Sequence, residues 1–393
     1  MYFPPEIWDH IFLYADPVTL TNLKTVCQHW NKSIDKILKQ NDHWYRKCKT
    51  EIPEYFWSTF CKTLNPKKYY TKFHEKHDAE MWMALYKLWI TCKNTMNWNT
   101  ENVCIEPLRR QHHAGQITCV ETSGNLIAIG TSEGYIYFYD MCALQKGPVY
   151  VADHMEYINT VQFITDETSI ICVSRSVNGH ISFWDVRLKK LIEKARGDLI
   201  CTSYSYCYTA AYNRIVIEGS IPRTVYEFDT DNIIAIGADN EEVLFYTQEG
   251  HFVHLSLNTP SGNYLNWTSI KPPNIKIRHY YIFKPDAVVC ITDNGYLGFL
   301  VKGKEWIVHN LFPILHGTPT TVLVYANVLI VGLDCGNVHV YYINDFETIN
   351  FNTISSKKFT LDYTAVISLN ILVQVEAYLI ISYIKKVCIV KLN

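Results

Sequence analysis

The chain has 393 residues, of which 48% are hydrophobic, 14% aromatic and 19% charged, and its formal net charge is −2. This length predicts two to three domains with sizeable cores, and this composition excludes wholesale disorder. The near-neutral charge provides no global attraction to nucleic acid or to an anionic membrane.

Two short helices are expected at the N-terminus. Pro4 and Pro5 suit a first helical turn, and Asp16-Pro17 is a second start with the carboxylate as N-cap. An apolar stripe follows, made of Leu20, Leu23, Val26, Cys27 and Trp30. So small a unit rarely buries such a surface alone. The surplus apolar face therefore indicates either docking to a partner or a helical hairpin folded onto the rest of the chain.

The order of these residues resembles the F-box pattern. It reads Phe3-Pro4-Pro5-Glu6-Ile7, Ile11-Phe12, Asp16-Pro17 and Val26-Cys27-Gln28-His29-Trp30, with Phe3 in place of leucine and Gln28 in place of a basic residue. The resemblance implies an F-box over residues 1–48 that binds a Skp-type adaptor and, through it, a cullin. The adaptor-binding residues that it implies are Pro4, Pro5, Ile7, Ile11, Phe12, Leu20, Leu23, Val26, Cys27 and Trp30.

Residues 49–104 are expected to form a helical connector. A helix over 78–98 starts at Asp78 as its N-cap and is apolar around much of its girth, so it should pack on both neighbours. His74 and His77 share a helix face, but two histidines without further ligands make a weak zinc site. A solvated helix face is favoured there, and we expect no metal and no cofactor.

From about residue 105 the hydrophobic period changes from helical to strand-like, and an internal repeat begins. The repeat is an apolar strand, a turn with glycine, and an alternating strand that ends in an aromatic residue, as in "NLIAIGTSEGYIYFYD" at 125 and "SIICVSRSVNGHISFWD" at 169. Gly134 and Gly179 stand 45 positions apart. This spacing predicts propeller blades of four strands each. Seven copies can be counted, but only 13 residues separate Asp229 from Val243, so six blades are the alternative.

One apolar segment, residues 364–384, is long enough to span a bilayer. Asn370, Gln374 and Glu376 interrupt it, and its β-branched halves predict two strands joined near residues 374–377. A transmembrane helix is the less favoured alternative.

The repeat resembles the WD-repeat family. Trp184-Asp185 is the one intact Trp-Asp pair, and the segment 154–161 looks like the histidine-led inner strand of that family. The family's aspartate before the turn glycine is replaced by Glu133, Asn178 and Cys335, so these blades should rely more on apolar packing than on buried hydrogen bonds. The expected fold class is α+β multidomain: an all-α F-box and helical connector, then an all-β WD-repeat-like propeller over 105–393.

An F-box joined through helices to a propeller resembles the substrate receptors of SCF ubiquitin ligases. This resemblance implies a non-catalytic subunit whose propeller binds a protein target. The sequence carries no supported catalytic motif, no phosphate-cradling glycine loop and no metal signature. Two rival classes remain. One is a WD-repeat scaffold whose F-box-like start packs inside the molecule, and the other is a nucleic-acid or lipid binder, which the charge does not favour.

Arginines in the loops of one propeller face are the candidate target-binding residues. Guanidinium groups match phosphate and carboxylate oxygens, so they predict a phosphorylated or acidic protein target. The alternative is ordinary loop charge. Arg187 and Arg214 are expected on the opposite face. The candidate set is Arg110, Arg175, Arg196, Arg223 and Arg278.

The 13 cysteines are odd in number and contain no Cys-x-x-Cys pair. This pattern favours a reducing compartment, where cysteines serve as small buried hydrophobes. We therefore expect a cytoplasmic or nuclear protein, or both, without membrane attachment. The F-box resemblance starts at residue 3 and leaves no room for an N-terminal dimerisation segment, so a monomer within the complex is expected.

Overall fold

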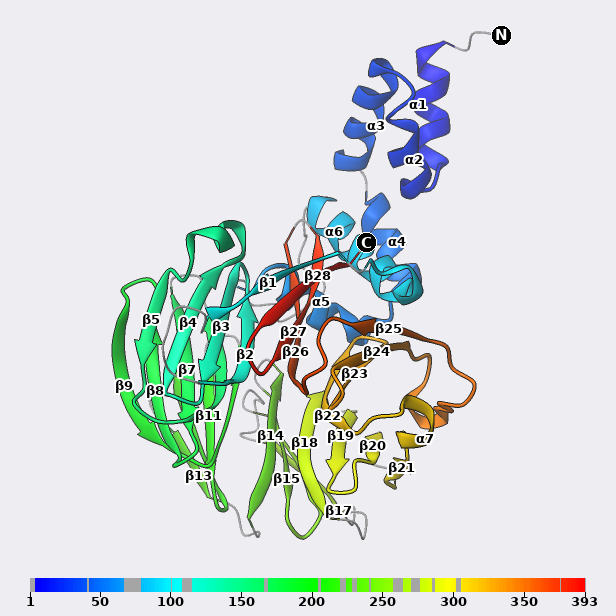
Figure 1. The fold of residues 1–393 in the computed structure, drawn as a ribbon. Helices are drawn as coiled ribbons and strands as arrows, with labels where there is room; N and C mark the ends of the chain where they lie inside the picture. The colour runs from blue at the N-terminus through cyan, green and yellow to red at the C-terminus, as the bar shows by residue number, and fades with distance from the viewer. Residues whose placement is uncertain are drawn as a thin grey trace.

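The computed structural model describes residues 4–40, 42–66, 79–99, 101–107, 115–165, 169–203, 206–219, 224–227, 232–239, 242–256, 264–269, 276–284, 287–301, 305–374 and 376–392. Helices make up the N-terminal part and a ring of β-sheets makes up the rest, with the first three helices projecting away from the ring (Figure 1). The helical elements are α1 (Pro5–Tyr14), α2 (Pro17–Leu23), α3 (Gln28–Gln40), α4 (His43–Glu51), the 3₁₀ turn η1 (Glu54–Phe56), α5 (Trp57–Leu64), α6 (Ala79–Lys93) and η2 (Thr95–Asn97).

Both predicted helix starts are confirmed. Pro4 is the N-cap of α1, and the carboxylate of Asp16 accepts hydrogen bonds from the backbone N–H groups of Val18 (3.0 Å) and Thr19 (3.3 Å). The apolar stripe expected from Leu20 to Trp30 is not one helix face, because α2 ends at Leu23 and α3 begins at Gln28. A turn of four residues therefore separates the two halves of the stripe.

The connector helix packs on both sides, as expected. The side chains of Trp82, Leu85 and Trp89 on α6 are buried, and they belong to the same hydrophobic cluster as α4, α5 and the sixth and seventh sheets. Phe60 of α5 lies 5.7 Å from the ring of Tyr325 in the propeller. This shared core fixes the connector to one side of the ring.

The described residues form seven four-stranded antiparallel sheets, which confirms the prediction of seven blades over the alternative of six. The innermost strands of consecutive blades contact one another and the seventh contacts the first, so the ring is closed. The first three blades are β2 (Ile117–Ser123), β3 (Leu126–Thr131), β4 (Tyr135–Asp140) and β5 (Tyr150–Asp153); β6 (Ile158–Thr165), β7 (Ile170–Ser176), β8 (His180–Asp185) and β9 (Lys190–Arg196); and β10 (Leu199–Ser203), β11 (Tyr206–Ala211), β12 (Arg214–Gly219) and β13 (Thr224–Glu227).

The other four blades complete the ring. They are β14 (Ile233–Asp239), β15 (Glu242–Thr247), β16 (His251–Ser256) and β17 (Tyr264–Ser269); β18 (Ile277–Lys284), β19 (Ala287–Thr292), β20 (Leu297–Val301) and β21 (Ile307–His309); β22 (Pro319–Tyr325), β23 (Val328–Leu333), β24 (Asn337–Tyr342) and β25 (Ser356–Thr360); and β26 (Val366–Val373), β27 (Ala377–Tyr383), β28 (Val387–Leu392) and β1 (Asn102–Ile105). Short helical segments η4 (Met141–Lys146), α7 (Phe312–Leu315) and η5 (Phe346–Thr348) lie in connections between strands.

The third blade differs from the expectation by one strand. Residues 213–229 are a weaker copy of the repeated phrase, so the repeat predicts that they supply the second and third strands of this blade. In the structure, β12 and β13 are its third and fourth strands. The inner strand of the fourth blade, β14, occupies the short interval before Val243 that suggested a missing strand. The repeat is therefore complete in spite of its compressed spacing.

The apolar segment 364–384 forms β26 and β27, as the interrupted pattern predicted. Among the described residues, the helices are all too short or too polar to cross a membrane.

The second blade retains part of the polar network expected from the family resemblance. The hydroxyl of Ser174 accepts a hydrogen bond from the Trp184 indole N–H (2.8 Å) and lies 2.8 Å from Nδ1 of His154. All three residues are buried. This network ties the inner strand's leading loop to the second and third strands of the blade.

Candidate functional site

The arm, defined here as α1, α2 and α3, buries apolar side chains that are continuous with the hydrophobic core of the connector. Phe12 and Leu20 are almost fully buried, with exposed fractions of 1% and 0%. The rings of Trp8 and Trp30 lie 4.6 Å apart, and the ring of Phe12 is 5.2 Å from that of Trp30. These aromatic contacts hold α1 against α3 and leave the outer side of α1 free for other contacts.

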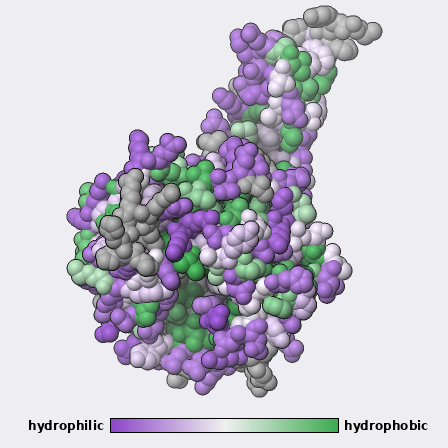
Figure 2. All heavy atoms as spheres, viewed as in Figure 1, coloured by the Kyte–Doolittle hydropathy of each residue, from purple (hydrophilic) through white to green (hydrophobic). Residues whose placement is uncertain are grey.

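The outer surface of the arm exposes large apolar side chains. Ile7 and Ile11 lie one turn apart on α1 and are 43% and 45% exposed, and Tyr14 is 89% exposed. Val18 on α2 and Val26 in the turn before α3 are exposed as well. Figure 2 shows hydrophobic residues at the surface along the arm. A solvent-exposed apolar surface of this kind on a projecting element is typical of a protein-interaction site.

The ten residues expected to bind the adaptor thus fall into different environments. Pro4, Ile7, Ile11, Val26 and Cys27 are exposed, whereas Phe12 and Leu20 belong to the core of the arm. Leu23 and Trp30 are partly buried and pack against that core, and the side chain of Pro5 lies outside the described part. Periodicity missed this division because both faces of the arm are apolar. A charge at Leu20 would therefore unfold the arm rather than only remove a docking contact.

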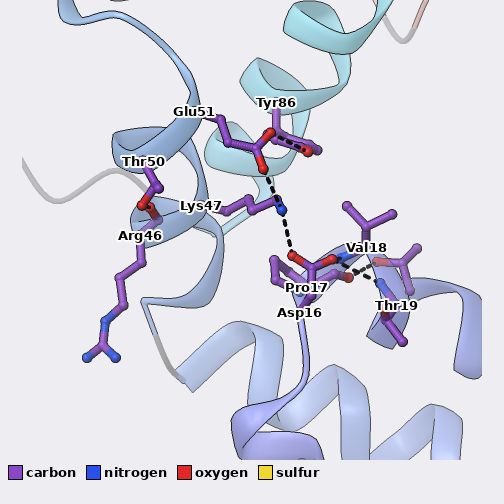
Figure 3. Close-up of polar contacts among 10 residues, drawn as sticks. Asp16, Pro17, Val18, Thr19, Arg46, Lys47, Thr50, Glu51 and Tyr86 are labelled. Carbon is purple, nitrogen blue, oxygen red and sulfur yellow. Dashed lines mark hydrogen bonds and ion pairs between the residues drawn. The ribbon is translucent and has the colours of Figure 1, made fainter.

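A polar network joins the arm to the connector (Figure 3). The ammonium group of Lys47 on α4 lies 2.8 Å from Asp16 Oδ1 and 2.6 Å from Glu51 Oε1. The hydroxyl of Tyr86 on α6 donates to Glu51 Oε2 at 2.9 Å. Asp16 caps α2 with its other oxygen, so this one chain of contacts links α2, α4 and α6 and sets the angle of the arm.

The network shifts the ionisation of its members. Burial raises the pKa of Asp16 and of Glu51. The hydrogen bond and charge of Lys47, together with backbone N–H groups at Asp16 and with Tyr86 at Glu51, outweigh burial, so both pKa values lie below their ordinary values. The hydrogen bond to Asp16 and then that to Glu51 raise the pKa of Lys47. Burial and the hydrogen bond to Glu51 raise the pKa of Tyr86 to about 12. All charges of the network are therefore present at neutral pH.

Replacing Lys47 with methionine should destabilise the junction between arm and connector by about 1 kcal/mol at pH 7, because it removes a partly exposed ion-pair network. A carboxylate whose pKa is lowered by folding stabilises the folded state at any pH above its pKa in the unfolded chain, which is 3.8 for Asp16 and 4.5 for Glu51. This stabilisation is lost as the pH falls through the lower pKa of the folded state. The difference between wild type and variant in urea unfolding midpoint should therefore shrink as pH falls below 3.8 and the two carboxylates become protonated. Arg46→Met is the control, since Arg46 points away from the network (Figure 3). A difference that does not decrease as pH falls from 7 into the acid range would contradict this account.

The propeller has two faces, and the direction of the strands shows at which face each connection lies. We call the face next to α5 and α6 the connector face; it carries the connections from the first to the second strand of each blade. There Val373, Gln374 and Glu376 line a pocket with α6. Pro66 lies beside Gly124, in the turn between β2 and β3. The far face carries the connections from the second to the third strand and from each blade to the next. It lies on the side of the ring opposite to α5 and α6, and none of the described N-terminal helices covers it.

At the connector side, the central channel of the propeller contains a cavity of about 410 Å³ lined by inner strands and by Lys62 and Pro66. Burial raises the pKa of Glu121 in this cavity to about 7. The described residues contain no cluster of three or more histidine, cysteine or carboxylate side chains that would hold a metal ion. The cavity therefore offers one isolated carboxyl group rather than a set of paired catalytic groups.

Three of the five candidate arginines lie toward the far face. Arg175 is next to the end of β7, Arg196 is the last residue of β9, and Arg278 is the second residue of β18. Arg110 and Arg223 lie outside the described residues. Arg187 follows β8 on the connector side, as expected, but Arg214 begins the third strand of its blade and therefore lies at the far face. The one-strand shift of the third blade is the reason for this correction.

The two arginines of the second blade point to opposite sides of their sheet. Arg175 is directly across from Ile181, whereas Arg196 is across from His180, and neighbouring residues on a strand face opposite sides. Burial lowers the pKa of Arg175, against the opposing effect of nearby Asp198, and its Nε has no hydrogen-bond partner among the described residues. The structure therefore does not bring Arg175 and Arg196 into one binding patch.

Sequence reasoning missed an apolar feature of the far face. Met155, Tyr157 and Val177, named here the far-face patch, are exposed, and the backbone N–H of Val177 donates to the Tyr157 carbonyl at 3.0 Å. Met155 is 82% exposed and has a φ of +64°, a conformation that is uncommon for a residue other than glycine. Glu156 stands between Met155 and Tyr157 in the sequence, and its carboxylate lies 2.8 Å from Nδ1 of His180. Other exposed apolar residues in far-face connections are Tyr212, Phe312 and Tyr363.

These surfaces define a protein-interaction module: a helical arm with an exposed apolar face, fixed by a connector to a propeller with a free face. Residues 3–50 match the F-box-like family model. The chain thus combines an F-box-like domain with a seven-bladed β-propeller whose fold resembles that of WD40 proteins.

Solved structures share the propeller fold at low sequence identity. The structure of U3-55K is 12% identical, covers 74% of this chain and 98% of its own, and has a TM-score of 0.54. The WD40 repeats of RRP9 (12% identity) and the β-propeller domain of Myceliophteria thermophila Cps50 (Swd1) (11%) each have a TM-score of 0.52 and cover 74% of this chain and 100% of their own. No curated protein matches the chain. At these identities the likeness concerns the fold alone.

Proposed function

We propose that this protein is the substrate-recognition subunit of an SCF-type ubiquitin ligase. Its F-box-like arm binds a Skp-type adaptor, and through the adaptor a cullin, while the propeller holds the target protein for ubiquitination. The observation that carries the proposal is the exposed apolar face of the arm around Ile7 and Ile11, within a segment that matches the F-box-like model. The chain itself contributes binding and positioning, and its partners contribute the chemistry.

The target is proposed to bind at the far face, because the connector occupies the opposite one. The far-face patch supplies apolar anchors, and carboxylates such as Asp153 and Glu156 border it. Hydrogen bonds from Ser176 and from His180 lower the pKa of Glu156 to about 2, so this group is anionic at neutral pH. An apolar target segment is favoured at this patch, and the phosphorylated or acidic target inferred from the arginines stays a prediction for Arg278 and its surroundings.

Affinity purification of the full chain, followed by mass spectrometry, tests the proposal. We expect a Skp-type adaptor and a cullin to co-purify in stoichiometric amounts, with one copy of this chain per complex. The rival is a WD-repeat scaffold without a ligase link. It predicts that neither component is captured while other proteins bind the propeller. Fluorescence microscopy of the tagged chain tests the proposed location in the cytoplasm, the nucleus or both.

A further inference from the structure

The propeller ring is closed by a short strand from its N-terminal side. β1 is the outer strand of the seventh blade and pairs with β28, which ends the ring on its C-terminal side. Asn102, Val103 and Cys104 are exposed, and only Ile105 of this strand is buried. The pairing of β1 with β28 therefore rests on four ladder positions and one buried side chain, and this arrangement favours local opening of β1.

Two cysteines face each other across this closing ladder. Cys104 is directly opposite Cys388, and their Sγ atoms are 2.9 Å apart. Residues directly opposite in an antiparallel pair have Cα atoms about 4.5–5.5 Å apart, within the roughly 4.4–6.8 Å that a disulfide spans. The two sulfur atoms can therefore be joined without a movement of the backbone.

The surroundings of the two thiols differ. Cys104 is exposed and Cys388 is buried. Burial raises the pKa of the Cys388 thiol, with a further contribution from its contact with Cys104, while the charge of Lys386 acts in the opposite direction. Lys386 is held by Asp362 at 2.9 Å and donates to the carbonyl of Leu361 at 3.0 Å. A reagent in solution thus reaches Cys104 first, and Cys388 is the second thiol to react.

We propose that Cys104 and Cys388 form a disulfide that locks the propeller ring, with a low-molecular-weight disulfide such as glutathione disulfide as the oxidant. The thiolate of Cys104 attacks one sulfur of the oxidant, forms a mixed disulfide and releases one glutathione thiolate. The thiolate of Cys388 then attacks Sγ of Cys104 and releases the second. The protons of the two cysteines pass through solvent to the two glutathione thiolates. Two protein thiols are oxidised, and one glutathione disulfide is reduced to two glutathione molecules.

The effect of this bond on the ring should be large. The two cysteines are 284 positions apart, so the bond closes a loop that contains nearly the whole propeller. Disulfides that close longer loops restrict the unfolded chain more strongly. The bond also fixes β1, the strand that follows the helical connector, to the last strand of the ring. Oxidation would thereby suppress separation of β1 from β28.

The test uses the full-length protein incubated with glutathione disulfide or with dithiothreitol. After blocking of free thiols and proteolysis, mass spectrometry should detect a peptide pair joined through Cys104 and Cys388 in the oxidised sample only. The thermal unfolding midpoint of the oxidised protein should exceed that of the reduced protein by at least about 5 °C. Cys104→Ser, at an exposed position, should lose the joined peptide and the rise in midpoint, and should match the wild type when both are reduced.

Cys142→Ser is the matched control, because Cys142 is also an exposed propeller cysteine. This variant should retain both the joined peptide and the rise. Absence of the peptide from the oxidised wild type, or oxidation of Cys104 only as a glutathione adduct, would overturn the proposal. A rise in midpoint that persists in Cys104→Ser would overturn it as well.

Discussion

Replacing Ile7 and Ile11 together with aspartate should weaken capture of a Skp-type adaptor by about a hundredfold or more. The two side chains are adjacent on the exposed side of α1, and each remains nearly half exposed in the free chain. Covering such side chains on binding is worth roughly 1–2 kcal/mol each, and a buried unpaired charge adds a penalty. Adaptor affinity measured by titration calorimetry with the full-length protein gives the size of the loss.

Two controls separate lost docking from lost folding. Leu188→Asp makes the same kind of change at an exposed leucine on the connector side of the second blade and should leave adaptor affinity unchanged. Leu20→Asp charges the core of the arm and should reduce its helical circular dichroism, whereas the Ile7 and Ile11 variant should keep that signal. Wild-type affinity in a folded Ile7 and Ile11 variant would refute docking through this face.

Features that depend on local spacing could be predicted from the sequence. The Asp16 cap needs only a carboxylate followed by proline and helical periodicity, and the structure confirms it. The turn glycines Gly134 and Gly179 likewise mark connections between second and third strands, where φ values of +91° and +78° favour glycine. Glycines mark this turn in five blades, and the apolar strand pattern alone marks the third and the seventh.

Features that depend on register across distant strands could not be predicted. The third blade has Tyr212-Asn213 at the turn where five of the other six blades have glycine, so alignment on glycines moved its strands by one position. That shift placed Arg214 on the wrong face. The opposite directions of Arg175 and Arg196 also required the observed pairing. The contact between Cys104 and Cys388 depends on closure of the whole ring, which no local pattern records.

The division of the arm into core and surface has a similar cause. Leu20 and Ile11 are both apolar and both occupy regular helical positions, but one is fully buried and the other is 45% exposed. Periodicity predicts an apolar face for each helix and does not tell which face meets its own neighbours. Which face of α1 is buried depends on the packing of α3 against it, where the ring of Trp30 contacts that of Phe12.

Replacing Met155 and Val177 together with aspartate should abolish most target binding by the propeller, with a loss of roughly a hundredfold or more. Both side chains are exposed in the far-face patch, and burying each against a target is worth about 1.5–3 kcal/mol. Aspartate tolerates the left-handed backbone of residue 155 better than most residues, so folding should not suffer. The added charges would also lie near Asp153 and Glu156, which already make this patch unsuited to acidic ligands.

Quantitative mass spectrometry of proteins captured by the full chain measures this effect even though the target is unidentified. Candidate targets are those captured by the wild type and lost with the Met155 and Val177 variant, while the adaptor stays bound through the arm. Leu188→Asp on the connector side should capture the same set as the wild type. Arg278→Glu tests for recognition by a guanidinium group. A phosphorylated or acidic target that binds near the start of β18 would be lost with this variant rather than with the Met155 and Val177 variant. Targets that depend on Arg278 and not on Met155 and Val177 would show that guanidinium recognition, rather than the apolar patch, selects the partner.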